Sequence, residues 1–243
     1  MNNYSAPAMN TRRRIVQLTA LGLGLAGYWL PWLSAPPAAL RLNGYELSEW
    51  VTYLPGVRDG SLPLSRLVFL LPLACLAILL ALAASRTAVA PPIYILGGEP
   101  QRPRALPTRP RSGLSALLPV DGLSGWALLA LGLLCALIVI PPYPYVLTAY
   151  ADPEYRVQFF VALFSLVALL LALYLPDQVK AIAQLGLAAA GGVLGLWSLL
   201  ALRPVASDLL GSPWPIGLGW GLMLAGFAIL AWVGLAQLFS PRA

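Results

Sequence analysis

Two acidic residues three positions apart, Glu46 and Glu49, have the residue types and the spacing of a paired-carboxylate site. Two neighbouring carboxylates can divide acid and base roles between them, or hold a metal ion. The same spacing is also ordinary for the solvated face of a short helix. Asn43 favours this second interpretation, because an Asn followed three residues later by Glu has the pattern of a helix capping box. We therefore expect no catalytic role for the pair.

Two further motifs also have structural explanations. Gly22, Gly24 and Gly27 match the GxGxxG dinucleotide fingerprint, but that fingerprint needs a strand before it and a helix that opens toward water after it. Here the glycines fall inside an apolar stretch, so the match is accidental. Asp121 directly precedes another apolar stretch, where a carboxylate caps the first turn of a helix. We expect a cap and not a catalyst.

The residue types that are missing narrow the function further. The chain contains no histidine, which excludes bis-His haem ligation, His-based proton shuttles and the metal or Ser-His sites of most intramembrane hydrolases. Cys75 and Cys135 fall in separate apolar stretches without the spacing of a metal site. No charged residue lies at the centre of an apolar stretch, although ion-coupled transporters normally need one there. The sequence predicts no enzyme and no metal site, and it specifies no cofactor; contact with a pigment or a lipid stays open.

The composition places the chain in a membrane. Hydrophobic residues make up 59% of the 243 residues and charged residues only 10%, whereas soluble domains carry about 25% charged residues. Helical stretches of ~20 apolar residues cross a bilayer, and six stretches near that length are present, at residues 15–33, 67–84, 123–140, 157–175, 181–202 and 216–239. The sequence predicts an all-α polytopic transmembrane helical bundle, in which residues 15–243 form a single transmembrane domain.

The basic residues orient this bundle. Positive charge is retained on the cytoplasmic side, and with both termini there, ten of the fifteen basic residues are cytoplasmic: Arg12, Arg13, Arg14, Arg86, Arg102, Arg104, Arg109, Arg111, Lys180 and Arg242. The basic tail 1–14 and the Pro-rich inner loop 85–112 are expected to contact anionic lipid headgroups through Arg12, Arg13, Arg14, Arg102, Arg104, Arg109 and Arg111. The basic residues lack the aromatic interleaving of a nucleic-acid surface, so no nucleic acid is expected as a partner. The predicted location is the cytoplasmic (inner) membrane of a bacterium.

The outer loop 34–65 contains a predicted amphipathic helix. After the capping box, an apolar face forms at helical spacing and ends at Pro55; it comprises Leu47, Trp50, Val51 and Leu54. We expect this short helix to lie on the outer membrane surface, where it could contact a partner. Trp29 and Trp32 are expected to anchor the first span at the same interface.

Small residues four positions apart predict close helix packing in the last two spans. Gly191 and Gly195 form a GxxxG pair, and Gly217, Gly221 and Ala225 repeat the spacing in the final span. Such residues leave a flat groove in which a neighbouring backbone can approach. The neighbour can be a helix of this bundle or of another subunit, and the spacing fits both.

These observations favour a non-catalytic accessory or scaffolding subunit of a larger membrane complex of respiratory or photosynthetic type. The alternative is a membrane component of an ATP-driven transporter, because six spans with both termini inside are similar in architecture to the permease subunits of ABC-2-type exporters. That resemblance implies a cytoplasmic ATPase as a partner. The Pro-rich inner loop is a poor element for transmitting force from such a partner. An enzyme acting on lipid at the outer face is the weakest hypothesis, since the chain has no histidine.

Overall fold

The computed structural model describes residues 6–35, 40–85, 118–120, 122–141, 148–211 and 213–239. The described chain is mostly helical, and each of the six predicted apolar stretches lies largely within one helix. The long helices are α1 (Ala6–Trp29), α4 (Arg66–Ala84), α6 (Gly122–Ile138), α7 (Arg156–Ala172), α8 (Asp177–Leu210) and α9 (Leu218–Leu238). The expectation of an all-α bundle is confirmed at this level. Asp121, the expected helix cap, lies outside the described residues.

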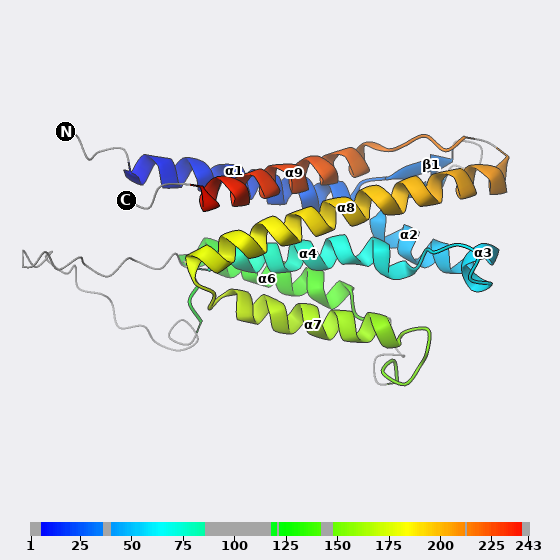
Figure 1. The fold of residues 1–243 in the computed structure, drawn as a ribbon, viewed down its shortest axis with the longest axis horizontal. Coiled ribbons are helices and arrows are strands. Elements are labelled where there is room, and N and C mark those ends of the chain that lie inside the picture. The colour runs from blue at the N-terminus through cyan, green and yellow to red at the C-terminus, as the bar shows by residue number, and fades with distance from the viewer. Residues whose placement is uncertain are drawn as a thin grey trace, which may run out of the picture.

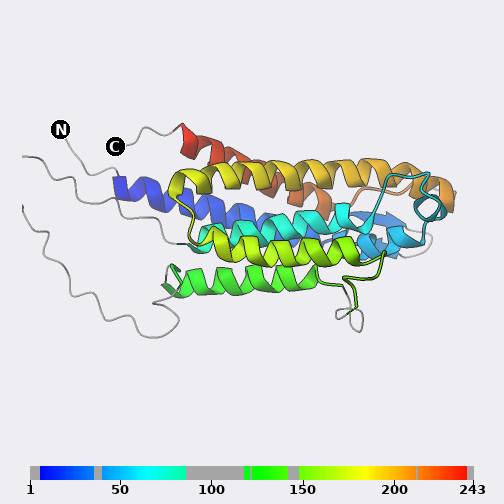
Figure 2. The same cartoon turned by 60° about the horizontal axis from the view of Figure 1, so that its bottom comes forward.

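Helix α4 is the centre of the bundle. It packs against α1, α7, α8 and α6, and Figures 1 and 2 show α6 and α7 on the side of α4 opposite to α1 and α9. Nearly every side chain from Phe69 to Leu82 is buried. Both cysteines, Cys75 in α4 and Cys135 in α6, are buried and free. A helix that is apolar on all sides must be covered by neighbouring helices or by lipid, and neighbouring helices cover α4.

Within the described residues, three helices are long and apolar enough to cross a membrane: α4, α8 and α9. Helices α6 and α7 are apolar but shorter, at 17 residues each. Helix α1 has 24 residues but begins in the polar tail that contains Arg12, Arg13 and Arg14. Helix α8 has 34 residues, about 51 Å at 1.5 Å per residue, and so continues well past the predicted stretch 181–202. It passes through Pro204 and ends at Gly211, whose φ of +62° favours glycine.

A small cap covers the end of the bundle at which α4 begins. It consists of strands β1 (Leu33–Ala35) and β2 (Leu40–Leu42), which pair antiparallel, followed by α2 (Gly44–Trp50), the 3-10 helix η2 (Val51–Tyr53) and α3 (Pro55–Arg58). The capping box is confirmed: the Glu46 N–H donates to Asn43 Oδ1 (3.0 Å) and the Asn43 N–H donates to Glu46 Oε2 (2.9 Å).

The apolar face of this cap points inward. Leu47, Val51 and Leu54 are buried, and α2 packs on α4 and α1. Trp50 is half-buried against Trp214, with ring centroids 5.5 Å apart. We expected this face to contact the membrane surface or a partner, but the chain itself covers it, because α2 packs on α4 and α1 and the Trp50 ring lies against Trp214 of the segment before α9.

Glycines set the closest helix contacts. A Cβ on Gly27 of α1 would meet the backbone of α9 at Met223 and Gly219, and a Cβ on Gly226 would lie 2.7 Å from the Ala20 carbonyl oxygen of α1. Helices α1 and α9 therefore approach with backbone in contact, as small residues permit. Two glycines of the GxGxxG match thus serve packing, Gly24 against Leu76 of α4 and Gly27 against α9.

The five predicted packing residues divide into two groups. Gly191 and Gly195 in α8 face α9, at Phe227 and Met223, and Gly217 donates its N–H to the Trp32 carbonyl (2.7 Å). Gly221 and Ala225 are exposed, and a Cβ on Gly221 would meet nothing within 4 Å. The described residues cover the first three positions and leave the last two exposed.

Candidate functional site

A buried arginine lies at the first turn of α4. The side chain of Arg66 is only 6% exposed, and its guanidinium carbon lies 4.5 Å from the centre of the Tyr155 ring, a cation–π contact. Ser65 and Arg66 directly follow the Pro-containing turn that ends the cap, so the start of α4 holds this side chain between the cap and α7. A buried cation is unfavourable unless acceptors surround it.

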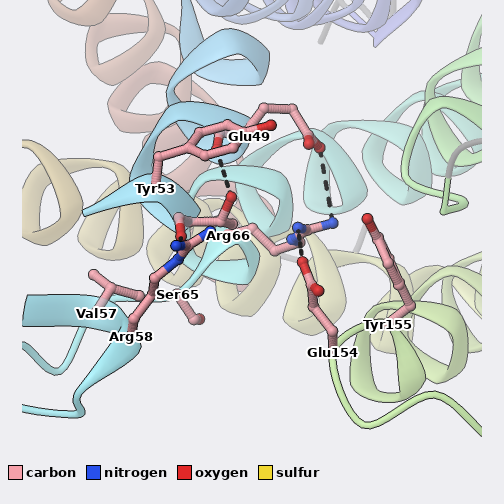
Figure 3. A pocket seen from close by; sticks show the side chains of 9 residues that line it. Glu49, Tyr53, Val57, Arg58, Ser65, Arg66, Glu154 and Tyr155 are labelled. Atoms are coloured by element: carbon pink, nitrogen blue, oxygen red, sulfur yellow. Dashed lines mark hydrogen bonds and ion pairs between the residues drawn. The ribbon is translucent and has the colours of Figure 1, made fainter. Parts of the chain in front are cut away.

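Acceptors from three other segments surround Arg66 (Figure 3). Nη2 donates to Glu154 Oε1 at 2.8 Å, just before α7. Nη1 donates to Gln158 Oε1 in α7 at 3.3 Å and lies 4.0 Å from Glu49 Oε1 in α2. Gln158 in turn donates through Nε2 to the Val139 carbonyl at the end of α6, at 3.0 Å. One cation therefore connects α2, α4, α7 and, through Gln158, the end of α6.

The two carboxylates differ in their contact with this cation. Glu154 is 60% exposed but makes a short charge-assisted hydrogen bond, whereas Glu49 is 35% exposed and beyond hydrogen-bond length. The two carboxylates and Arg66 leave one formal negative charge, which the exposed Arg58 nearby balances. Glu49 accepts no hydrogen bond from a side chain within the described residues, although it lies 4.0 Å from the Arg66 guanidinium.

An open pocket of about 460 Å³ adjoins the cluster. Its lining comes from the cap, the start of α4 and the segment before α7: Glu49, Thr52, Tyr53, Val57, Arg58, Ser65, Arg66, Glu154 and Tyr155. Arg58 is exposed and donates through Nε to the Thr52 carbonyl at 3.4 Å. Close by in α2, burial and then the Glu49 carboxylate raise the pKa of Tyr45, so its phenol is neutral at physiological pH.

The sequence singled out Glu49 as one member of a possible carboxylate pair, with Glu46 as the other member. Glu46 is held in the capping box, while the second carboxylate beside Glu49 is Glu154, from a distant part of the chain. Neither Arg66 nor Glu154 was singled out from the sequence. A signal for Arg66 was nevertheless present, since a charge directly at the start of a long apolar helix must find a partner there.

The remaining predicted residues serve packing or lie elsewhere. Trp32 is fully buried and donates through Nε1 to the Gly27 carbonyl (3.0 Å), while Trp29 is exposed and lies beside Tyr45.

Three of the predicted headgroup contacts lie in α1. Arg14 donates to Ser124 Oγ (3.2 Å) and so links α1 to α6. Arg12 is exposed and Arg13 is half-buried in the same turn of α1. Four further predicted headgroup contacts lie outside the described residues, namely Arg102, Arg104, Arg109 and Arg111.

The described residues offer little other chemistry. Among them, no group of three or more His, Cys, Asp or Glu side chains could hold a metal ion. At the far end of the bundle, Gln17 donates to Gln184 Oε1 (3.1 Å), and Gln184 donates to the Leu230 carbonyl (2.9 Å), which ties α1, α8 and α9 together. These bonds satisfy buried amides and leave no reactive group. Comparison with family models, with curated proteins and with solved structures finds no match to this chain.

Proposed function

We propose that this protein is a non-catalytic, integral-membrane accessory or scaffolding subunit of a larger complex of respiratory or photosynthetic type. Its six long helices would each cross the cytoplasmic membrane of a bacterium, with both termini in the cytoplasm. Helices α1 and α8 begin, and α9 ends, at the same end of the bundle in Figure 1, which agrees with that topology. The Arg66 cluster would then face the outside.

The observation that carries the membrane part of the proposal is the apolar outer surface. Large side chains along α7 and α8 are exposed, among them Phe160, Phe164, Leu171, Val193 and Leu200. Contiguous apolar surfaces of this kind mark contact with a membrane or another protein. Hydrocarbon would cover this surface without the cost of exposing it to water.

The partner part of the proposal rests on the two small residues that the chain leaves uncovered. Gly221 and Ala225 lie one turn apart on the outer face of α9, whereas Gly219, Met223 and Gly226 face inward. In a bilayer, helices associate through close packing of small residues, since lipid tails already satisfy apolar surface. A transmembrane helix of another subunit would fit this face.

The test is purification of the full-length protein from its native membrane in a mild detergent. We expect a stoichiometric complex with other membrane subunits, which Gly221→Leu disrupts. The matched control is Val193→Leu, at an exposed position of α8, and it should leave the complex intact. Neither variant should unfold below the temperature of the parent, because neither position contacts the interior.

Other outcomes would redirect the proposal. Co-purification of a cytoplasmic ATPase in fixed proportion would favour the transporter component instead. A protein that purifies alone, or that moves protons or solutes when reconstituted alone in liposomes, would contradict a scaffolding role.

A further inference from the structure

We propose that the pocket beside Arg66 binds a small organic ammonium group. Two sources carry this chemistry at a membrane surface: the aminoethyl end of a zwitterionic phospholipid headgroup, and a free primary amine. The recognition elements are the Glu49 carboxylate, the exposed Tyr53 ring and Arg58 on the opposite wall.

The Glu49 carboxylate is the first argument. Glu49 and Glu154 face one buried guanidinium, and Arg58 on the other wall balances the second negative charge, so the lining is formally neutral and suits a zwitterion. Glu154 already receives the hydrogen bond from Arg66. Glu49 lies 4.0 Å from the same guanidinium, and within the described residues no side chain donates a hydrogen bond to its carboxylate. Its oxygens are therefore available to an ammonium donor.

The walls of the pocket favour an organic cation over a metal ion. Tyr53 is 69% exposed at the pocket, and aromatic rings attract ammonium groups through their π faces. Metal sites of hard cations need several oxygen ligands in a compact shell, whereas only two carboxylates line this pocket and one is already paired with Arg66.

The opposite wall adds a cation. Figure 3 shows Arg58 and Glu154 on opposite sides of the pocket. Arg58 is exposed, and the hydrogen bond that it donates to the Thr52 carbonyl uses one of its five N–H groups. A ligand with a phosphate next to its ammonium group would place the phosphate toward Arg58 and the ammonium toward Glu49. Binding of a phospholipid headgroup depends on the membrane location proposed above, whereas binding of a free amine does not.

The experiment is calorimetric titration of the purified full-length protein, in dodecyl maltoside and an amine-free buffer. The probes are dihexanoyl-phosphatidylethanolamine, ethanolamine, and dihexanoyl-phosphatidylglycerol, whose headgroup has no ammonium. We expect saturable binding of at least one ammonium probe and about tenfold weaker binding, or none, of the glycerol lipid. Tight binding of the ethanolamine lipid alone identifies a headgroup site, and equal binding of free ethanolamine identifies an amine site.

Three variants locate the binding. Glu49→Gln keeps the Arg66–Glu154 pair and should weaken the ammonium probe about tenfold. Asp59→Asn removes an exposed acidic charge from the same cap, outside the pocket lining, and should leave the affinity within about twofold. Tyr53→Ala, at an exposed position, should weaken binding of the ammonium probe severalfold. If Glu49→Gln does not fold, the affinity of Tyr53→Ala for this probe tests the site in its place.

The proposal is overturned if neither ammonium probe binds saturably, if the glycerol lipid binds equally well, or if the folded Glu49→Gln protein binds like the parent. These titrations need no partner subunit. Their failure is therefore separate from failure of the scaffolding role, which the purification test addresses.

Discussion

Replacement of Gly27 by Ala tests the central packing contact of the bundle. A Cβ at this position would lie 2.7 Å from the Gly219 carbonyl oxygen and closer still to the Met223 amide nitrogen of α9. Both atoms belong to backbone and cannot rotate away, so α1 and α9 would have to separate. Gly22 provides the matched control, because it lies in the same helix and a Cβ there would meet nothing within 4 Å.

The magnitude follows from two opposing terms. Ala is better than Gly in a helix by about 0.5–1 kcal/mol, and both substitutions gain this amount. Insertion of a methyl group into a closely packed contact costs about 1–3 kcal/mol. The helix-propensity gain cancels between the two variants, so Gly27→Ala should be less stable than Gly22→Ala by about 1–3 kcal/mol.

The assay is reversible unfolding of the two variants and the parent in mixed micelles of dodecyl maltoside and SDS, followed by circular dichroism. Gly226→Ala and Gly221→Ala repeat the comparison on α9, where a Cβ at 226 would lie 2.6 Å from the Gly24 amide nitrogen and one at 221 would meet nothing. Equal stability within both pairs would refute the backbone contact between α1 and α9.

Three further predictions concern polar groups. Glu154→Gln weakens the hydrogen-bonded ion pair with Arg66 and should lower the free energy of unfolding by about 1–2 kcal/mol, less than for a fully buried pair because Glu154 is 60% exposed; no change in the same unfolding assay would mean that the pair is not formed. Gln184→Leu removes the hydrogen bond from Gln17 and the bond to the α9 backbone, and should cost about 0.6–1.7 kcal/mol, measured against the conservative Gln184→Asn. Burial raises the pKa of Tyr45 above its usual 10.0, so the stabilisation from its neutral phenol is complete below pH 10.0 and is lost as pH rises through the folded-state pKa. Tyr45→Phe should therefore lose less stability than the parent above pH 10.0, and identical pH profiles in thermal unfolding would contradict this cause.

The helices and the capping box could be predicted from the sequence, because each depends on residues close together in the chain. Runs of apolar residues located the helices, because the hydropathy of a long stretch depends on nothing else in the chain. The capping box at Asn43 and Glu46 was predicted for the same reason, since both partners lie within one turn.

Contacts between residues that lie far apart in the sequence could not be predicted from it. Glu49 could not be matched to Glu154, because their meeting depends on how α7 packs on α4. The glycines of α9 illustrate the same limit: a Cβ on Gly226 would meet α1, one on Gly234 would meet α8 and one on Gly221 would meet nothing within 4 Å, and the positions of α1 and α8 decide which of them are covered. The i, i+4 spacing identifies a groove but not its occupant.

The two polar networks explain why so apolar a chain adopts one packing arrangement. Apolar contacts in lipid discriminate weakly between alternative helix rotations, whereas a buried amide or guanidinium is satisfied in few of them. Gln184 fixes α8 against α1 and α9 at one end, and Arg66 fixes α4 against α2 and α7 at the other. The Arg66 network contains charged side chains and adjoins the pocket, whereas the side chains of the Gln184 network are neutral amides. Two networks with the same structural task thus differ in charge, which is why the proposed ammonium site lies at the capped end of the bundle.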